Sequence, residues 1–214
     1  DAAADGAVSV AAADLDGDGD PDLVAGIRNT GAVRWYRNDG AGQFTSATVS
    51  NNVAFVYSVA TADVDGDGDL DVLSASFGDN FVAWHENDGA SGFTQRTVGT
   101  GVGAASAVTA ADIDADGDVD VIAAAAGDDE VLWFENDGSQ GFTPRTINQT
   151  AQGARGVFAI DLDRDGDVDV LSASNNDDKV AWYENDGLGN FTIDIITTNA
   201  DDVLSVRAAD LDGD

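Results

Sequence analysis

The residues of this chain whose types and spacing could do chemistry are aspartates in a recurring nine-residue loop. Each loop carries aspartate at positions 1, 3, 5, 7 and 9, and four complete copies follow one another at a spacing of 49 residues. A fifth copy begins near the end of the chain and contributes three aspartates. The loop aspartates are Asp14, Asp16, Asp18, Asp20 and Asp22; Asp63, Asp65, Asp67, Asp69 and Asp71; Asp112, Asp114, Asp116, Asp118 and Asp120; Asp161, Asp163, Asp165, Asp167 and Asp169; and Asp210, Asp212 and Asp214.

Carboxylates at this spacing favour a bound cation. Two like charges about 4 Å apart cost roughly 1 kcal/mol even in water, so the loop would be unfavourable without a positive charge among them. Ca²⁺ takes oxygen ligands in a flexible loop, whereas Zn²⁺ prefers nitrogen and sulfur. The chain has one histidine and no cysteine. We therefore predict about one calcium ion in each complete loop, with the aspartates as ligands.

The residues between the aspartates also fit a loop folded around an ion. Position 6 is glycine in every complete copy, which allows the positive φ of a tight turn. We expect position 7 to offer its backbone carbonyl and the aspartate at position 9 to close the shell with both oxygens. The alternative, a merely acidic surface, gives no reason to keep glycine at one position. An EF-hand needs glutamate at position 12, but the four copies carry Ala25, Ser74, Ala123 and Ser172 there.

The composition is that of an acidic globular chain. Its 214 residues are 43% hydrophobic with a mean hydropathy of -0.14, which suits a domain with a substantial core. The net charge is -32 at pH 7, and 23 of the 41 acidic residues lie in the loops. Nucleic acids and anionic membrane surfaces need basic patches, so the charge argues against both as partners. No apolar run could span a bilayer, and the N-terminus lacks the basic region of a signal peptide.

The 49-residue period organises the whole chain without insertions. A strand rich in small residues precedes each loop, a short apolar strand follows it, and a third strand carries valine and tryptophan two positions apart. The third strand ends in Asn-Asp-Gly, a strong hairpin signal, and a fourth strand begins with Phe-Thr. We expect a single domain over 1–214. Its repeats are 1–49, 50–98, 99–147, 148–196 and the partial repeat 197–214.

Four strands in each repeat, with no sustained 3.6-residue periodicity, predict an all-β fold. Repeats of this length are typical of propellers and solenoids. The third strand is apolar on both faces, as a sheet packed between two neighbours requires, because Tyr36, His85, Phe134 and Tyr183 lie opposite the Val/Trp face. Pro144 falls in the fourth strand, which suits an outer edge. We predict a β-propeller of four-stranded antiparallel blades, with four full blades and the start of a fifth.

The repeat resembles a known family in its motifs. The segments Ala-Asp-Leu-Asp-Gly-Asp-Gly-Asp, Asp-Val-Leu-Ser-Ala-Ser and Val-Ala-Trp-Tyr-Glu-Asn-Asp-Gly are similar to FG-GAP/VCBS repeats, β-propeller blades related to those of integrin α-subunits. The resemblance covers the full chain. It implies calcium in the hairpin between the first and second strands, an extracellular or cell-surface location and about seven blades. Members of this family include adhesion modules, lectins and parts of polysaccharide-degrading proteins.

Side chains outside the loops fit structural roles better than chemical ones. The tryptophans of the third strand could stack on sugar rings, but their alternation with valine favours packing between blades. His85 stands where other repeats carry tyrosine or phenylalanine, so we expect an aromatic filler and a nearly silent change to phenylalanine. Asn-Asp-Gly is interpreted as a turn first and as a ligand-contacting rim second. For Arg28, Arg34 and Arg37 of the first repeat, ion pairs with an adjacent acidic blade are favoured over contact with a partner.

No asymmetric set of side chains indicates catalysis, which needs a distinct constellation of nucleophile, acid and base. The chain has no cysteine and no second histidine, and the loop carboxylates are assigned to calcium. We therefore predict a non-enzymatic binding or adhesion module for a polysaccharide or a cell-surface protein. Two alternatives stay open: a structural or assembly repeat of a surface protein, and the propeller domain of a polysaccharide lyase or hydrolase.

The last repeat stops inside its aspartate loop, at Asp214. A natural domain rarely ends there, and an arc of four blades would expose the apolar faces of its end blades. We expect the chain to be part of a longer repeat protein, with end blades that meet further blades of the same chain or of a second copy.

Overall fold

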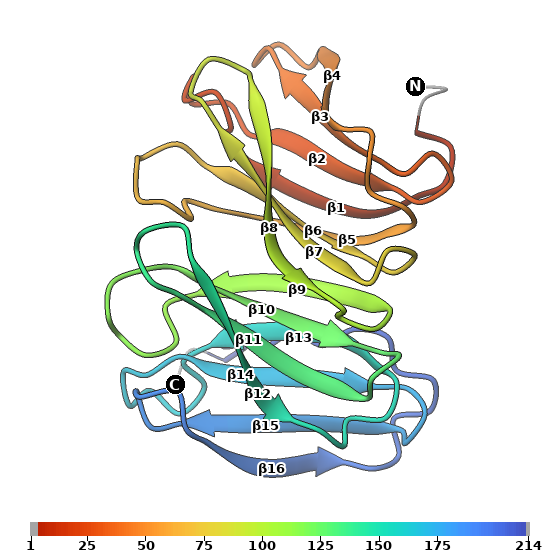
Figure 1. Ribbon diagram of the computed structural model, residues 1–214, viewed down its shortest axis with the longest axis vertical. Coiled ribbons are helices and arrows are strands. Elements are labelled where there is room, and N and C mark those ends of the chain that lie inside the picture. Colours follow the sequence, from red (N-terminus) through yellow and green to blue (C-terminus); the bar gives the residue numbers. More distant parts are fainter. Residues whose placement is uncertain (1–3, 213–214) are drawn as a thin grey trace.

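The computed structural model describes residues 4–212 and places sixteen strands in four sheets (Figure 1). The first sheet contains β1 (Ala7–Ala13), β2 (Asp22–Ile27), β3 (Ala32–Asn38) and β4 (Phe44–Ser50). The second contains β5 (Val56–Ala62), β6 (Asp71–Ser76), β7 (Phe81–Asn87) and β8 (Phe93–Thr100). The third contains β9 (Ala105–Ala111), β10 (Asp120–Ala125), β11 (Glu130–Asn136) and β12 (Phe142–Asn148). The fourth contains β13 (Ala154–Ile160), β14 (Asp169–Ser174), β15 (Lys179–Asn185) and β16 (Phe191–Thr197).

Each sheet is a blade in which consecutive strands pair antiparallel. In the second blade, Val59 pairs with Ser74, Leu73 with Trp84, and Trp84 with Arg96. The aspartate loop joins the first strand to the second, and Asn-Asp-Gly joins the third to the fourth. The all-β, four-stranded repeat predicted from the sequence is therefore confirmed. Within residues 4–212, no helix has the length and apolar character needed to cross a membrane.

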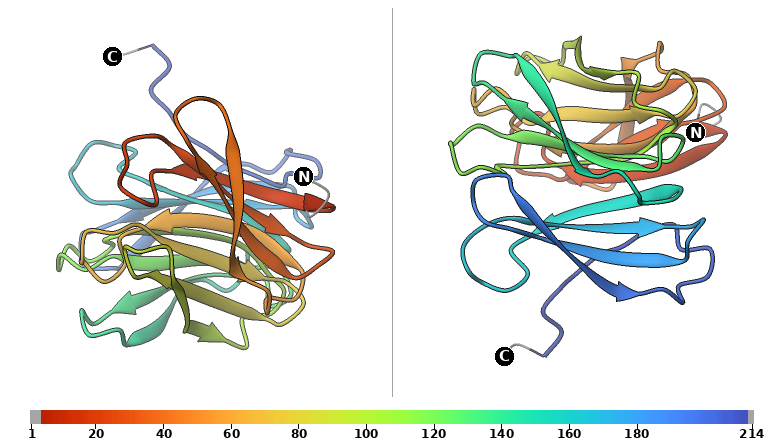
Figure 2. Two further views of the ribbon diagram at one scale, coloured as in Figure 1. Left: turned by 90° about the horizontal axis from the view of Figure 1, so that it is seen from above. Right: turned by 60° about the horizontal axis from the view of Figure 1, so that its bottom comes forward.

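The four blades are arranged around their first strands, which gives the chain the architecture of a β-propeller (Figure 2). Strand β1 contacts β5, β5 contacts β9, and β9 contacts β13. Serine hydroxyls help to join these inner strands: Val59 N donates to Ser9 Oγ at 3.1 Å, and Val108 N donates to Ser58 Oγ at 3.3 Å. Small residues on the first strand thus allow close approach at the axis, as the composition of these segments predicts.

The hydrophobic core lies between the blades. Leu73, Val82 and Trp84 of the second blade pack against Val121 and Phe134 of the third. Equivalent clusters join the first blade to the second and the third to the fourth. The second and third blades are covered on both faces, which explains why their third strands are apolar on both faces.

The outward faces of the first and last blades are open to solvent. Val10 of the first blade is 65% exposed, whereas its counterpart Val59 is 6% exposed. Ile196 of the last blade is 57% exposed, whereas its counterpart Val98 is 5% exposed. The repeat places the same kind of residue at these positions in every blade, so the difference comes from the absence of a neighbouring blade within residues 4–212.

The partial repeat lies along the inner strand of the fourth blade. Residues 203–210 form no strand, but Arg207 Nη1 donates to Val157 O at 3.5 Å. A Cβ added to Gly156 would lie 2.9 Å from Ser205 Cα, so the two backbones approach closely. The segment therefore lies beside β13 much as β9 lies beside β5.

Candidate metal centre

The four complete aspartate loops lie at one end of the blades, because each joins the end of a first strand to the start of a second. In every loop three carboxylates converge, with one oxygen of each within 4.8 Å of the others. The convergent sets are Asp14, Asp16 and Asp18; Asp63, Asp65 and Asp71; Asp112, Asp114 and Asp120; and Asp161, Asp163 and Asp165. Positions 1 and 3 contribute in every blade, joined by position 5 in the outer two blades and position 9 in the middle two.

Buried carboxylate oxygens without a partner show what these sets lack. Asp63 Oδ1, Asp65 Oδ1, Asp112 Oδ1 and Asp114 Oδ1 are each buried with no hydrogen-bond donor. A buried acceptor left unpaired costs about 1–3 kcal/mol, and a charged one costs more. Burial raises the pKa of the Asp65 carboxyl, and the charge of Asp67 raises it further. A set of unpaired, purely oxygen donors fits a hard divalent cation such as Ca²⁺.

The aspartate at position 9 is buried and holds its own blade together. Asp71 is 0% exposed, its Oδ2 accepts a hydrogen bond from Val64 N at 3.0 Å, and its Oδ1 accepts one from Asn87 N at 2.7 Å. Burial raises the pKa of Asp71 to about 6 and that of Asp120 to about 7, although backbone hydrogen bonds oppose the shift. Both oxygens thus have a structural role that the aspartate pattern did not indicate, while the expected part of position 9 in closing the metal shell remains a prediction.

The aspartate at position 7 turns its side chain away from the convergent set. A Cβ on Gly40 would lie 2.2 Å from Asp20 Oδ2, and a Cβ on Gly89 would lie 2.3 Å from Asp69 Oδ2. These side chains therefore lie against the Asn-Asp-Gly hairpin. The same arrangement recurs for Asp118 and Asp167. The expected contribution of position 7 through its backbone carbonyl remains a prediction.

Two loop positions have the left-handed backbone conformation. At position 6, φ is 93°, 98°, 98° and 102° for Gly19, Gly68, Gly117 and Gly166, so the expected positive φ is present. Position 4 shares it, with φ of 70° at Gly17, 59° at Ala115 and 66° at Arg164. Residues other than glycine cost of order 1 kcal/mol or more in this conformation. The mixture of glycine, alanine and arginine at position 4 concealed this feature in the sequence.

The aspartates of the partial repeat differ from the others. Arg164, from position 4 of the fourth loop, forms an ion pair with Asp210 at 2.9 Å. Asp212 is exposed, and the predicted ligand Asp214 lies outside the described residues. The structure therefore gathers no convergent set from the part of this repeat that it describes.

In the first loop, an arginine of the protein itself pairs with one of the aspartates. Arg37 Nε forms an ion pair with Asp16 Oδ2, whereas the glutamates at the equivalent position of the next two blades pair with arginines of the outer strand. Arg28 lies over Tyr57 of the second blade, with its guanidinium carbon 6.0 Å from the ring centroid. Arg34 donates to Thr48 Oγ1. The favoured interpretation, ion pairs with an adjacent blade, is wrong for Arg37, because its partner belongs to its own blade.

The asparagine of the Asn-Asp-Gly turn connects the metal loops of neighbouring blades. Asn136 Nδ2 donates to Val64 O, in the loop of the preceding blade, at 3.0 Å and to Val119 O, in its own loop, at 3.0 Å. Asn136 N in turn donates to Asp120 Oδ1 at 2.8 Å. This residue was interpreted as turn chemistry, so its bonding between blades was missed.

The same connection recurs along the chain. Asn87 Nδ2 donates to Leu15 O at 2.9 Å, and Asn185 Nδ2 donates to Ile113 O at 2.7 Å, each across 72 residues of sequence. In the first blade, where no earlier blade is described, Asn38 Nδ2 reaches only the carbonyl of its own loop. Since the loop residue that accepts from one blade donates its own N–H to the buried aspartate of its loop, hydrogen bonds run from loop to loop through all four blades.

The tryptophans belong to the core between blades. Trp35, Trp84 and Trp133 are 2%, 1% and 2% exposed, which supports the packing role expected from their alternation with valine. Trp35 Nε1 also donates to Asp22 Oδ2 at 2.8 Å, so the indole supports the buried aspartate of its loop. Trp182 of the last blade is only half-buried, because its face lacks a complete neighbouring blade.

His85 is a buried core residue with a specific partner. Its Nε2 lies 2.9 Å from Ser74 Oγ, and burial lowers its pKa to about 4. In the fourth blade, Tyr183 OH lies 2.9 Å from Ser172 Oγ in the same way. The aromatic residue of the third strand and the serine diagonal to it on the second strand therefore form matched pairs, which the residue types at one repeat position did not reveal.

Comparison with known proteins supports the reading of the repeat. The model of the FG-GAP-like repeat matches residues 14–74, 63–123, 112–172 and 161–214. One similar solved structure is a lectin from Agrocybe aegerita described as specifically recognising non-reducing terminal N-acetylglucosamine. The two chains share 20% identity with a TM-score of 0.61, over 90% of this chain and 53% of the lectin chain, so this chain spans about half its length. That similarity establishes the fold alone. No curated protein sequence matches the chain.

Proposed function

Because the chain belongs to the FG-GAP-like repeat family, we propose that it is a calcium-stabilised β-propeller acting as a non-catalytic carbohydrate-binding module outside the cell or at its surface. The observation that carries the proposal is the convergence of three carboxylates in each complete loop, with buried oxygens that lack a donor in the middle blades. A hard cation satisfies those oxygens, and a carbohydrate ligand accords with the strongly acidic, non-basic surface.

In each complete blade the carboxylates at positions 1 and 3, together with position 5 or position 9, would hold the ion. Calcium would supply the positive charge that balances the converging carboxylates. Side chains of the protein position the loop. The buried aspartate holds the loop against its own blade, and the asparagine of the next blade holds it against its neighbour. Metal binding and packing of the blades are thereby linked.

Grooves between blades support the carbohydrate part of the proposal. A groove of about 330 Å³ between the first and second blades is lined by Asn52, Phe55 and Asp79 among other residues, and Phe55 is 53% exposed. Amide and carboxylate groups around an exposed aromatic ring suit a sugar, which offers hydroxyls and an apolar ring face. Because blades repeat, a polymer could engage several weak sites and gain avidity.

A glycan array read with calcium and with excess chelator tests the function. We expect calcium-dependent binding of a defined set of glycans by the folded protein. A folded, calcium-loaded protein that binds no glycan would contradict the proposal and favour a structural repeat. Cleavage of a uronic-acid polymer by the purified chain would contradict its non-catalytic part and favour the propeller of a lyase or hydrolase.

A further inference from the structure

Two arginines without a carboxylate partner gather at the end of the propeller opposite the metal loops. The chain has nine lysines and arginines against 41 acidic residues. Five of the nine form ion pairs, namely Arg37, Arg96, Arg145, Arg164 and Lys179. Within residues 4–212, Arg28 and Arg155 form none. In so acidic a protein, unpaired guanidinium groups at one place call for an explanation.

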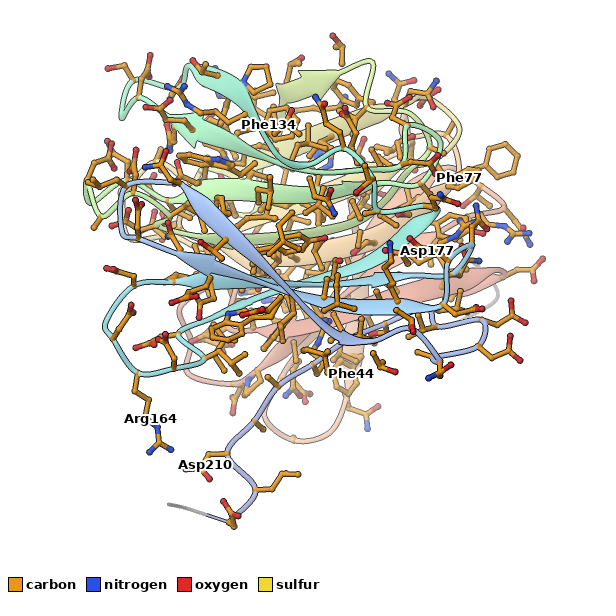
Figure 3. All side chains as sticks on the ribbon, turned by 90° about the horizontal axis from the view of Figure 1, so that it is seen from below. Phe44, Phe77, Phe134, Arg164, Asp177 and Asp210 are labelled. Carbon is orange, nitrogen blue, oxygen red and sulfur yellow. The ribbon has the colours of Figure 1, made fainter. Side chains whose placement is uncertain are left out.

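The two arginines come from distant blades and meet at one aromatic pair. Tyr57 and Phe77 of the second blade stack with centroids 4.8 Å apart. Arg28 of the first blade and Arg155 of the fourth each place the guanidinium carbon 6.0 Å from the Tyr57 centroid, and Arg155 lies 5.3 Å from that of Phe77. Figure 3 shows Phe77 on the side of the molecule remote from Arg164 of the fourth metal loop.

Contact with the rings explains where the two guanidinium groups lie, but it does not give their N–H groups a hydrogen-bond acceptor. Cation–π contact uses the face of a guanidinium, whereas its N–H groups point outward in the plane. Arg155 Nε is buried and has no hydrogen-bond partner. Two cations at one ring also repel each other unless an anion lies between them. Charge and hydrogen bonding therefore both indicate a missing anionic partner.

The carboxylates of Asp79 and Asp128 are occupied by backbone donors, and Asp177 of the fourth blade pairs with Lys179 at 2.8 Å. Asp79 accepts from Ala54 N at 2.6 Å, and Asp128 accepts from Gly103 N at 2.6 Å. Each of these hydrogen bonds holds the segment that leads into the first strand of the aspartate's own blade. Since the backbone already uses these two aspartates, the donors of Arg155 remain available for a ligand.

A cavity at the axis gives the ligand a place. It holds about 290 Å³ between the inner strands of the blades, and its lining includes Tyr57, Ser58, Ser106, Arg155 and Arg207. Hydroxyls and guanidinium groups on a cavity of this size suit a polar ring that carries a carboxylate, because the planar fork of arginine matches a carboxylate with two parallel bonds.

We propose that this axial mouth, defined by Arg28, Tyr57, Phe77 and Arg155, binds the carboxylate of an acidic saccharide of the uronic-acid class. The inference rests on the proposed carbohydrate-binding function and names a ligand class for one site. Arg155 and Arg28 bind the carboxylate, the stacked rings hold both arginines in place, and the hydroxyls of the cavity contact the sugar.

Isothermal titration of the calcium-loaded protein tests this site with a β-1,4-linked glucuronic acid tetramer and with cellotetraose, its neutral counterpart. We expect the acidic tetramer to bind at least tenfold more tightly. Arg155→Gln and Arg28→Gln should each weaken its binding at least fivefold. Arg145→Gln is the matched control: it removes the same charge from the outer strand β12, where Arg145 pairs with Glu135, and should leave binding unchanged.

Arg28 is exposed, so its substitution leaves the fold intact and keeps the test decisive if Arg155→Gln proves unstable. Equal affinity for the two tetramers, or acidic binding that survives both substitutions, would overturn the inference. Sulfate that competes as strongly as the acidic tetramer would overturn its saccharide part. Neutral glycans bound equally by wild type and Arg155→Gln would leave the proposed function standing while this site failed. Absence of binding to any glycan would contradict both the proposed function and this site.

Discussion

The first and third metal loops share one motif but differ in electrostatic state. In the first loop Arg37 forms an ion pair with Asp16, so the protein itself neutralises part of the carboxylate charge. In the third loop Asp112 and Asp114 each keep a buried oxygen without a donor, and no basic side chain pairs with either within the described chain. Identical ligand spacing therefore does not imply identical affinity. The residue before the last asparagine of the third strand, Arg37 in the first blade and Glu135 in the third, therefore affects how much carboxylate charge stays unbalanced in the loop.

Chelation should produce the largest effect, since it removes the cation from both kinds of loop. At free calcium about a hundredfold above the dissociation constant, each site contributes about 2.7 kcal/mol, and four sites contribute up to about 11 kcal/mol. We expect excess chelator to lower the melting temperature strongly, with recovery on adding Ca²⁺ and poor recovery with Mg²⁺. Melting that chelator leaves unchanged would show that the loops hold no stabilising ion.

Substitution of one aspartate in each loop should give different losses of stability for the first and third loops. Asp114→Ala should remove a site worth about 2.7 kcal/mol at saturating calcium, whereas Asp16→Ala should cost less than half as much because Arg37 already weakens the first site. Calorimetric melting in calcium measures both, and melting in chelator provides the control, where neither variant should lose stability. Equal losses in calcium would contradict the distinction between the loops.

Substitutions of the turn asparagines test the hydrogen bond between blades without changing any aspartate of the loops. Asn136→Ala leaves two loop carbonyls without their donor and should cost about 2 kcal/mol more than the loss of the turn bond that both asparagines accept, whereas Asn38→Ala leaves one loop carbonyl without its donor and should cost about 1 kcal/mol more. Urea unfolding in calcium gives both values. If the two costs were the same, the bond between blades would contribute nothing to stability.

Replacing the internal cation should make the first loop resemble the third. Arg37→Glu places at this position the residue that the later blades carry and should strengthen calcium binding by the first loop about tenfold, or about 1.4 kcal/mol. Calcium titration of the chelated protein should then show one class of site instead of two. Arg34→Glu on the same strand is the control, because Arg34 bonds to Thr48 and not to a loop aspartate. The same gain in this variant would point to overall charge alone.

The smallest effect concerns the core. The sequence predicts a nearly silent His85→Phe, but the change leaves Ser74 Oγ without its partner and should cost about 1 kcal/mol. Adding Ser74→Ala should recover most of that loss, because the third blade carries Ala123 and Phe134 at these two repeat positions. A double variant no better than the single one would show that packing, not the hydroxyl, sets the cost.

The fold and the convergence of the loop aspartates could be predicted because each depends on residues close in sequence and repeated in register. Asp63 and Asp65 lie in one loop, so their convergence follows from spacing alone. The role of Asn136 could not be predicted, because a strong turn signal already accounted for it and its second partner lies in the preceding repeat. Burial of Asp71 was hidden for a related reason, since an aspartate in an acidic loop gives no sign that it faces the core.

The axial mouth lay beyond sequence reasoning for a different reason. Arg28 and Arg155 stand in separate repeats and at different positions within them, so neither spacing nor register relates them. Only the arrangement of the blades around their first strands brings both to Tyr57. Features that break the repeat are the least predictable, and they are also where a single specific ligand could be recognised.

The hydrogen bonds from loop to loop bear on how the propeller opens over time. In the middle blades, the amide of Ile113 is held by Asp120 while its carbonyl is held by Asn185 of the next blade. The loop cannot detach from its own sheet without also releasing its neighbour, so its amide protons exchange with solvent only when two blades separate. In the fourth blade, Leu162 N is also held by the buried aspartate of its loop, but no later asparagine within residues 4–212 holds Leu162 O. Slow hydrogen exchange should therefore cover the loops of the first three blades, where Leu15 is held in the same way, and fade at the loop of the fourth, as in arrays where each unit is stabilised by its nearest neighbours.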